Sequence, residues 1–320
     1  MEAKKRYSIL SLATPQNVQE EQEKFMSSQT YNPQFRYNWS HEMVQYVKDT
    51  KPHYYHFIEA MVSQDYSNLR ELAHINFATQ IDKEVLRLAQ QITSSVPDIK
   101  DPPTISELIK AFEQALGFLG IPYSVELSDK AGFKFRPLHR LQKMYISKHG
   151  TFTYMSTDSA IKHELTHVIR YVNTRENNIP YAKGYLPTEE GLASYVQDYW
   201  GHQGNLSLFQ HAAQYEAMCV GEAGTFRDIY DYFRSIGLSS EQSWVKTVRQ
   251  KYGYKDTSQP GTFVKPAMYF YHARRIASLT KNEIWRLFNG KISIDDLTLF
   301  PDYSGLISLE KLQKFYATKW

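Results

Sequence analysis

The chain has 320 residues, of which 42% are hydrophobic and 22% are charged, so it is long enough to bury a large core in one or two domains. Its 37 basic and 34 acidic residues leave a net charge of only +3, which argues against a nucleic-acid-binding protein. The single cysteine, Cys219, excludes an intrachain disulfide bond and fits a reducing, cytoplasmic environment.

No segment of the sequence is predicted to target or cross a membrane. No apolar run approaches the roughly 18 residues that a spanning helix needs. The basic residues 1–6 are followed by a short apolar stretch that runs into Pro15, which makes a poor signal peptide. We therefore expect a cytoplasmic protein whose partners include neither a membrane nor a nucleic acid.

The N-terminal part of the chain is predicted to be helical. Residues 14–27 have the pattern of a capped polar helix, and residues 40–94 have that of two or three helices. The clearest linker, residues 96–106, contains three prolines. We therefore predict an N-terminal helical region, residues 1–95, that packs on a second region, residues 96–320.

Strand signals occur only between residues 121 and 154. The runs at 123–127, 134–147 and 151–155 predict a small antiparallel sheet, which leads into the next helix. Further helices are predicted at residues 104–118, 205–252, 262–288 and 308–318. The predicted fold class is therefore α+β and mostly helical.

The chain is organised around His163-Glu164-Leu165-Thr166-His167, which matches the pattern HExxH. Two histidines four residues apart stand one above the other on a helix, where their ring nitrogens can share one tetrahedral zinc ion. Glu164 lies about 100° further round the helix, beside the metal, where it can take a proton from the attacking water. The pattern therefore predicts one zinc ion per chain, with His163 and His167 as ligands and Glu164 as the general base.

The helix that carries this pattern is predicted to have two distinct faces. Its apolar residues are Ile161, Leu165, Val168, Ile169 and Val172. At about 100° per residue, these fall opposite the two histidines and are expected to pack into the core. Arg170 and Thr174 share the histidine face, so we expect them beside the same cleft.

A third ligand is expected from the segment TEEGLA, residues 188–193. A catalytic zinc site takes three protein ligands and leaves a fourth position for water. Thr188 is a plausible N-cap, which places Glu189 and Glu190 in the first turn of a second helix. The helix dipole alone also favours acids there, but beside HExxH the best third ligand is Glu190, with Glu189 as the substitute. Gly191 would let the two helices approach closely.

Two other interpretations of the pattern are possible. HExxH is short and also arises by chance, in which case its histidines occupy a solvated face. The separation of the two helix faces and the acidic segment that follows favour a zinc site instead. A purely structural zinc ion is disfavoured, because such sites usually have four ligands and are rich in cysteine.

Motifs spread over most of the chain resemble those of a known family. The matching residues are Pro15, Asn17, Phe25, Tyr31-Asn32-Pro33, Phe35, Tyr37, His163-Glu164, Thr166 to Arg170, Thr188 to Ala193, Arg249, Gly261 to Lys265 and Tyr269. On these residues the chain resembles the zinc tyrosine carboxypeptidases, the microtubule-associated tyrosine carboxypeptidase family with its bacterial QEGLA-motif relatives. The family usually has one more residue between its two histidines, and an acid where this chain has Pro266. These departures leave the identity of the substrate open.

The resemblance implies a zincin-like fold of the gluzincin kind, with residues 96–320 as the catalytic domain. It implies His163, His167 and Glu190 as zinc ligands and Glu164 as the base. The implied reaction is hydrolysis of the C-terminal peptide bond of a peptide or protein, with release of tyrosine or another aromatic residue.

A carboxypeptidase must also hold a free C-terminal carboxylate, for which a guanidinium group is best suited. Arg170 is a candidate through its helix face, with a structural ion pair as the alternative. Arg249 and Lys265 are candidates through the resemblance alone. Tyr269 is a candidate to stabilise the oxyanion, although packing is the commoner role of a tyrosine. Asp198 is a candidate to orient a ligand histidine.

Alternative functions share the same metal site. One is a zinc endopeptidase or aminopeptidase, and another is a regulatory protein that keeps zinc without turnover, against which the intact Glu164 argues. The histidines outside any metal-ligand spacing are interpreted as structural or surface residues: His74, His139, His202, His211 and His272.

Overall fold

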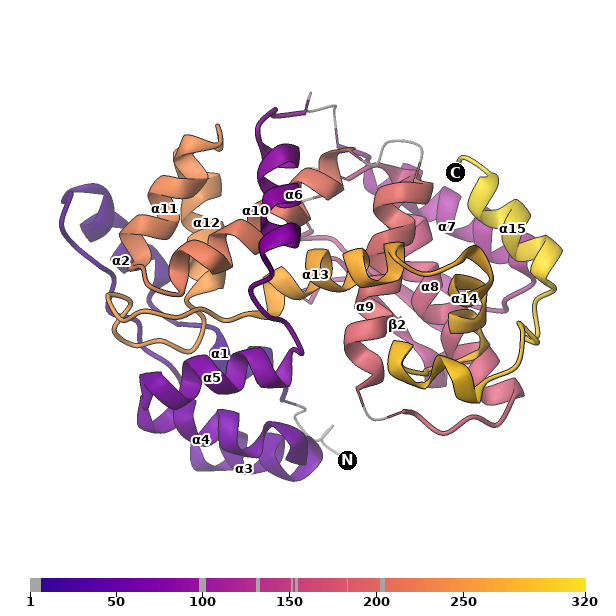
Figure 1. Cartoon of the computed structure of the whole chain (residues 1–320), viewed down its shortest axis with the longest axis horizontal. Helices are drawn as coiled ribbons and strands as arrows, with labels where there is room; N and C mark the ends of the chain where they lie inside the picture. The colour runs from indigo at the N-terminus through magenta and orange to yellow at the C-terminus, as the bar shows by residue number, and fades with distance from the viewer. Residues whose placement is uncertain are drawn as a thin grey trace. The chain divides into compact units, whose positions relative to one another are not determined.

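The computed structural model describes residues 7–97, 102–130, 133–150, 152, 155–182, 184–201 and 205–320. Within these ranges the chain is mostly helical and has one small three-stranded sheet (Figure 1). The predicted class, α+β and mostly helical, is therefore confirmed. Among the described helices, none combines the length and the apolar composition needed to cross a membrane.

The elements have the following bounds. The α-helices are α1 (Ile9–Ala13), α2 (Val18–Met26), α3 (His41–Thr50), α4 (Tyr55–Ser63), α5 (Tyr66–Asn76), α6 (Lys83–Thr93), α7 (Ile105–Leu119), α8 (Thr157–Glu176), α9 (Tyr185–Tyr195), α10 (Asn205–Gly221), α11 (Phe226–Ser235), α12 (Ser240–Gln250), α13 (Lys265–Ala277), α14 (Lys281–Arg286) and α15 (Leu309–Ala317). The strands are β1 (Ser124–Ser128), β2 (Phe135–Leu138) and β3 (Lys143–Ser147). The short 3-10 helices are η1 (Pro52–Tyr54), η2 (His139–Leu141), η4 (Leu287–Asn289) and η5 (Ile294–Leu299), and η3 (Val196–Trp200) is a π-helical turn.

The chain divides into two compact units, each built from two stretches of sequence. Unit 1 comprises Met1–Val96 and His211–Met268, and unit 2 comprises Pro97–Gln210 and Tyr269–Trp320. The predicted boundary after residue 95 falls beside the end of the first stretch, but residues 211–268 group with the N-terminal part. Hydrophobic periodicity locates a helix in the sequence without saying which other helix its apolar face meets, so this return of the chain was not predicted. The packing of residues 1–95 on a catalytic core stays a prediction.

An aromatic cluster joins the two stretches of unit 1. Phe25 of α2 is fully buried. Its ring centroid lies 5.0 Å from that of Phe226, 4.9 Å from that of Tyr230 and 5.3 Å from that of Trp244. Tilted and edge-on pairs at this distance stabilise beyond the area that they bury. The cluster therefore ties α2 to α11 and α12.

Residues 40–94 form four helices, α3 to α6, where two or three were predicted. Local caps make the additional breaks. Helix α4 ends at Gln64, whose φ of 58° is left-handed. Helix α5 follows at once, because the Asp65 side chain accepts a hydrogen bond from the N–H of Asn68 at 3.2 Å. Short-range caps of this kind interrupt a helix without interrupting its apolar pattern.

The sheet of unit 2 has the order β1-β3-β2. Strand β3 lies in the middle, parallel to β1 and antiparallel to β2. The sheet is therefore mixed, and the predicted antiparallel sheet was wrong, because alternation of side chains does not encode the order of strands.

The predicted run at 134–147 contains both β2 and β3. Helix η2 and Gln142, with a φ of 50°, reverse the chain between them. Of the third predicted run, 151–155, only residues 152 and 155 are described, and neither lies in a strand.

Candidate active site

Helix α8 carries the HExxH residues and has a core face and a cavity face. It begins after Ser156, whose side chain accepts a hydrogen bond from the N–H of Ser159 at 3.1 Å. The predicted core face is confirmed for its fully buried residues, Ile161, Leu165, Val168 and Ile169. The side chains of His163 and His167 remain 15% and 14% exposed, as expected for groups that border a cavity.

Three side chains converge on one point. Nε2 of His167 lies 3.7 Å from Oε2 of Glu190, and Nε2 of His163 lies 4.0 Å from the same oxygen. Bonds of about 2.0–2.2 Å to a tetrahedral zinc ion place the ligand atoms roughly 3.4 Å apart, so small side-chain shifts would suffice. In the described part of the chain, this is the one group of three such residues with ligand atoms close enough to share a metal ion. Two imidazole nitrogens and a carboxylate oxygen fit a catalytic zinc site.

These side chains border a cavity of about 310 Å³. Its lining residues are Phe135, Pro137, His139, His163, Glu164, His167, Glu189, Glu190 and Tyr269. The predicted ligands, the predicted base and Tyr269 therefore share one cavity.

The environment of Glu164 suits a group that exchanges protons. Burial raises the pKa of Glu164 to about 7, an effect that His167 opposes and Glu190 reinforces. A group whose pKa lies near the working pH can both accept and return a proton. A divalent cation held by the neighbouring ligands would lower this pKa again.

Helix α9, which carries Glu190, begins earlier than predicted. Its N-cap is Gly184, with a φ of 78°, so Glu189 and Glu190 lie in the second turn and not in the first. Pro187 is the third residue of the helix, where the backbone N–H has no intrahelical partner, so the proline does not stop the helix. The hydroxyl of Thr188, the predicted N-cap, instead accepts a hydrogen bond from the N–H of Ile294 at 2.9 Å.

Gly191 permits a close approach of helices, but the partner is not α8. A Cβ atom on Gly191 would lie 2.6 Å from Cβ of His272 in α13. His272 is itself buried, which agrees with its interpretation as a structural histidine.

Glu189 orients one of the ligands. Nδ1 of His167 donates a hydrogen bond of 2.9 Å to Oε1 of Glu189. The same carboxylate pairs with Nζ of Lys291, and its Oε2 lies 3.4 Å from Nη1 of Arg170. Burial alone would raise the pKa of Glu189, but Lys291, His167 and Arg170 hold it well below its usual range. Glu189 therefore lies beside the candidate metal ligands as an ionised group that can orient His167.

Arg170 does not face the cavity. Its side chain is fully buried, and Nε donates to the carbonyl oxygens of Leu287 and Gly290, each at 2.9 Å. Nη2 donates to the carbonyl oxygen of Ile292 at 2.7 Å. This geometry contradicts the predicted role in substrate binding and favours the structural alternative. The angle around the helix predicts the face on which Arg170 lies. It does not predict that residues 287–292, over 100 residues further along the chain, cover that side chain.

The remaining predicted residues are dispersed. Arg249 is exposed on α12 and Lys265 is half-buried at the start of α13, both in unit 1, so their roles stay predictions. Asp198 is buried in η3 and accepts a hydrogen bond from Ser207 at 2.6 Å. Glu189, adjacent to the candidate third ligand, contacts the candidate ligand His167.

His139 is a cavity residue that the sequence did not indicate. Its ring stacks on that of Tyr171, with centroids 3.9 Å apart and planes 7° apart, and its Nδ1 lies 3.0 Å from the hydroxyl of Tyr123. Burial and the nearby Lys291 lower the pKa of His139 to about 4, so the ring is neutral near pH 7. Because His139 stands alone in the sequence, only the reversal of the chain after β2 brings it to the cavity.

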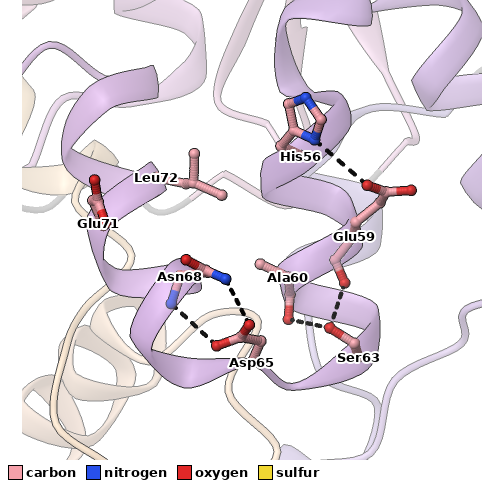
Figure 2. Close-up of a pocket in the computed structure, with 8 residues that line it drawn as sticks. All are labelled: His56, Glu59, Ala60, Ser63, Asp65, Asn68, Glu71 and Leu72. Atoms are coloured by element: carbon pink, nitrogen blue, oxygen red, sulfur yellow. Dashed lines mark hydrogen bonds and ion pairs between the residues drawn. The ribbon is translucent and has the colours of Figure 1, made fainter.

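A second cavity, of about 380 Å³, lies within unit 1 between residues of α4 and α5 (Figure 2). Two of its carboxylates, those of Glu59 and Asp65, already have local partners. Oε2 of Glu59 lies 3.5 Å from Nδ1 of His56, and Asp65 accepts hydrogen bonds from Asn68 (Figure 2). These residues cap and brace the helices, so we assign them no chemistry.

Known proteins with similar sequences cover most of the chain. A microtubule-associated tyrosine carboxypeptidase 1 from Mus musculus is 26% identical over 315 residues, which cover 93% of this chain. The proteins of the same name from Homo sapiens and Rattus norvegicus are each 24% identical, over 92% and 90% of the chain. The chain spans between 61% and 63% of the length of these relatives. No protein-family model matches the sequence.

All three relatives are named as carboxypeptidases. They also agree on one family, the microtubule-associated tyrosine carboxypeptidases. The resemblance predicted from the motifs is therefore confirmed as a distant but consistent relationship over about nine tenths of the chain.

Proposed function

We propose that this protein is a zinc metallopeptidase that releases tyrosine or another aromatic residue from the C-terminus of a peptide or protein. The main support is the convergence of His163, His167 and Glu190 in a cavity that also contains Glu164. The names of the relatives support the carboxypeptidase activity and the terminal tyrosine.

His163, His167 and Glu190 would hold the zinc ion, one per chain. Zinc in such a site polarises the scissile carbonyl group and makes water nucleophilic near pH 7. Glu164 accepts a proton from the attacking water and returns it to the leaving amine. This assignment uses the place of Glu164 beside His163 on α8 and in the same cavity as the proposed ligands.

The main chain of the substrate would pair with β2, which is an edge strand with β3 as its neighbour. Ser147 donates a hydrogen bond from its N–H to the carbonyl oxygen of Lys134 at 2.9 Å, across from it in the ladder. Pairing alternates in an antiparallel ladder, so the backbone groups of Phe135 and Pro137 face away from β3, on a side where no described strand pairs with β2. A proline is tolerated there because its position needs no N–H donor. Phe135 and Pro137 also line the cavity, so a bound strand would lie beside the metal ligands.

Two further side chains in the cavity can stabilise charge on the scissile oxygen. Tyr269 and His139, whose ring is neutral near pH 7, both line the cavity. Either group donates a hydrogen bond that strengthens as negative charge develops on the oxygen. Arg249 and Lys265 stay candidates for the terminal carboxylate.

One observation favours an alternative. Among the described residues that line the cavity, none is a lysine or arginine that could pair with a terminal carboxylate, which suits an endopeptidase equally well. A regulatory role without turnover is the other alternative. A cytoplasmic location and the lack of a nucleic-acid partner stay predictions from the sequence.

A peptide library read by mass spectrometry tests the proposal. Each peptide with a varied final residue is paired with a twin that has an amidated C-terminus. We expect loss of the terminal residue, fastest for tyrosine or another aromatic, and little cleavage of the amidated twins. Equal cleavage of both would assign an endopeptidase, and no cleavage with bound zinc would assign the regulatory alternative.

A further inference from the structure

The segment 287–292, which consists of η4 and the three residues after it, is bound to the polar side of α8. Arg170 donates to the carbonyl oxygens of Leu287, Gly290 and Ile292. The side chain of Asn173 donates to the carbonyl oxygen of Phe288 at 2.8 Å. These four hydrogen bonds, at 2.7–2.9 Å and buried, fix a segment whose only regular structure is the short helix η4.

The same attachment fixes the backbone of Lys291. Its N–H donates to Oγ1 of Thr174 at 2.7 Å, and its carbonyl oxygen accepts from the N–H of Ala182 at 3.0 Å. A Cβ on the preceding Gly290 would lie 2.8 Å from Oγ1 of Thr174, so the backbone there lies directly against α8. The hydrogen bonds of its N–H and of its carbonyl oxygen therefore fix the position of the Lys291 backbone, from which the side chain extends.

The Lys291 side chain is 6% exposed and ends at the metal ligands. Nζ pairs with Oε1 of Glu189 and also lies 3.4 Å from the carbonyl oxygen of His167. Oε1 of Glu189 is the oxygen that accepts the hydrogen bond from Nδ1 of His167. One ammonium group thus contacts both the orienting carboxylate and the backbone of the ligand.

This hydrogen bond decides which ring nitrogen of His167 can bind a metal. In the neutral ring, Nδ1–H donates the hydrogen bond that Glu189 accepts, which leaves the lone pair of Nε2 available on the side of Glu190. A Glu189 carboxylate that could rotate would hold neither the ring plane nor this tautomer.

We propose that Lys291 is a positioning residue for the metal ligand His167, which it orients by fixing the Glu189 carboxylate. The inference rests on the proposed function, because it assumes that His167 binds zinc. Lys291 does not touch the substrate or the reacting atoms in this role. Lys291 contacts Glu189, and Glu189 in turn contacts the ring of His167.

The test measures zinc affinity directly, by competition with a chromophoric chelator, and needs no substrate. Replacing an outer partner of a ligand histidine typically costs 10–100-fold in metal affinity. We expect Lys291→Met to weaken zinc binding by roughly 10-fold or more. In the Glu189→Gln background, Lys291→Met should cause little further loss, since the two residues act through one contact.

Lys251 provides a matched control. It is also a fully buried lysine, and its Nζ donates to the carbonyl oxygens of Gly224 at 3.2 Å, Gln259 at 2.6 Å and Gly261 at 2.8 Å, all in unit 1. Lys251→Met makes the same chemical change in unit 1, whereas the proposed ligands belong to unit 2, so it should lower the melting temperature and leave zinc affinity within about twofold.

The outcomes separate the two proposals. If the wild-type chain binds no zinc, both this inference and the proposed function are overturned. If the wild type binds zinc and folded Lys291→Met binds it equally tightly, only the inference is overturned. If Lys291→Met does not fold, the zinc affinity of Glu189→Gln is measured in its place. Unchanged affinity in Glu189→Gln would overturn the inference, because Lys291 is proposed to act on His167 through Glu189.

Discussion

Glu189 and Glu190 are adjacent in the sequence but take different nitrogens of the same histidine. Oε1 of Glu189 lies 2.9 Å from Nδ1 of His167, whereas Oε2 of Glu190 lies 3.7 Å from Nε2. Only the second carboxylate also approaches His163, at 4.0 Å. The geometry therefore favours Glu190 as the third ligand and gives Glu189 the orienting role.

The first prediction concerns zinc content. Glu190→Ala and His163→Ala should each remove the bound zinc, because two ligands are too few to retain it in a catalytic site. Elemental analysis of purified protein measures this, with Glu176→Ala at the exposed end of α8 as the control. Full occupancy in Glu190→Ala would pass the role of third ligand to Glu189.

The second prediction concerns the general base. Glu164→Gln should keep its zinc and lose at least about 100-fold in the rate of peptide hydrolysis, the lower end expected for general acid–base catalysis. Glu176→Gln makes the same change on the same helix and should hydrolyse at the wild-type rate. Near-normal hydrolysis by Glu164→Gln would remove Glu164 from the mechanism.

The third prediction concerns Arg170. Arg170→Met should lower the free energy of unfolding by about 3–5 kcal/mol, because it leaves buried carbonyl groups and Glu189 without their cationic partner. Urea denaturation measures this, and Arg175→Met, at an exposed position of α8, should change the value by no more than about 0.5 kcal/mol. A fully stable Arg170→Met with a raised KM would restore the role in substrate binding.

The fourth prediction concerns the contact between α9 and α13. Gly191→Ala should destabilise by about 1–3 kcal/mol, since the new Cβ would lie 2.6 Å from Cβ of His272. Gly117→Ala in α7 is the control, because a Cβ there meets no atom within 4 Å and alanine favours the helix by about 0.5–1 kcal/mol. Thermal melts in which both variants gain stability would contradict the close approach.

The fifth prediction concerns pH. Nε2 of His74 lies 2.9 Å from Oε1 of Glu222, and its Nδ1 lies 2.7 Å from the carbonyl oxygen of Thr79. Burial alone would lower the pKa of His74, but these two partners outweigh it, so the pKa lies above the ordinary 6.5. The protonated His74 ring therefore contributes its full share to the free energy of unfolding below about pH 6.5. This contribution is lost as the pH rises through the folded-state pKa of His74.

A His74→Gln variant tests whether the stability that His74 contributes falls as the pH rises. The difference in free energy of unfolding between wild type and variant should be larger near pH 5.5 than near pH 9, in urea denaturation at both values. An equal difference at both pH values would show that the charge of His74 contributes nothing.

The sequence alone determined the features that depend on local spacing. Four-residue spacing in a helix puts His163 and His167 on one face and the apolar residues on the other, whatever surrounds the helix. The acidic segment at 188–193 likewise follows α8 closely enough for Glu190 to reach the histidines. The motifs were also sufficient to indicate the family that the relatives share.

Only the tertiary structure decided what covers each face. Arg170 lies on the same helix face as the histidines, but the carbonyl groups of residues 287–292 bury it. The same fold brings Lys291 and His139 beside the ligands, although neither belongs to a motif. The physical reason is that helical periodicity is a property of neighbouring residues, whereas burial depends on chain segments over 100 residues apart that share no pattern.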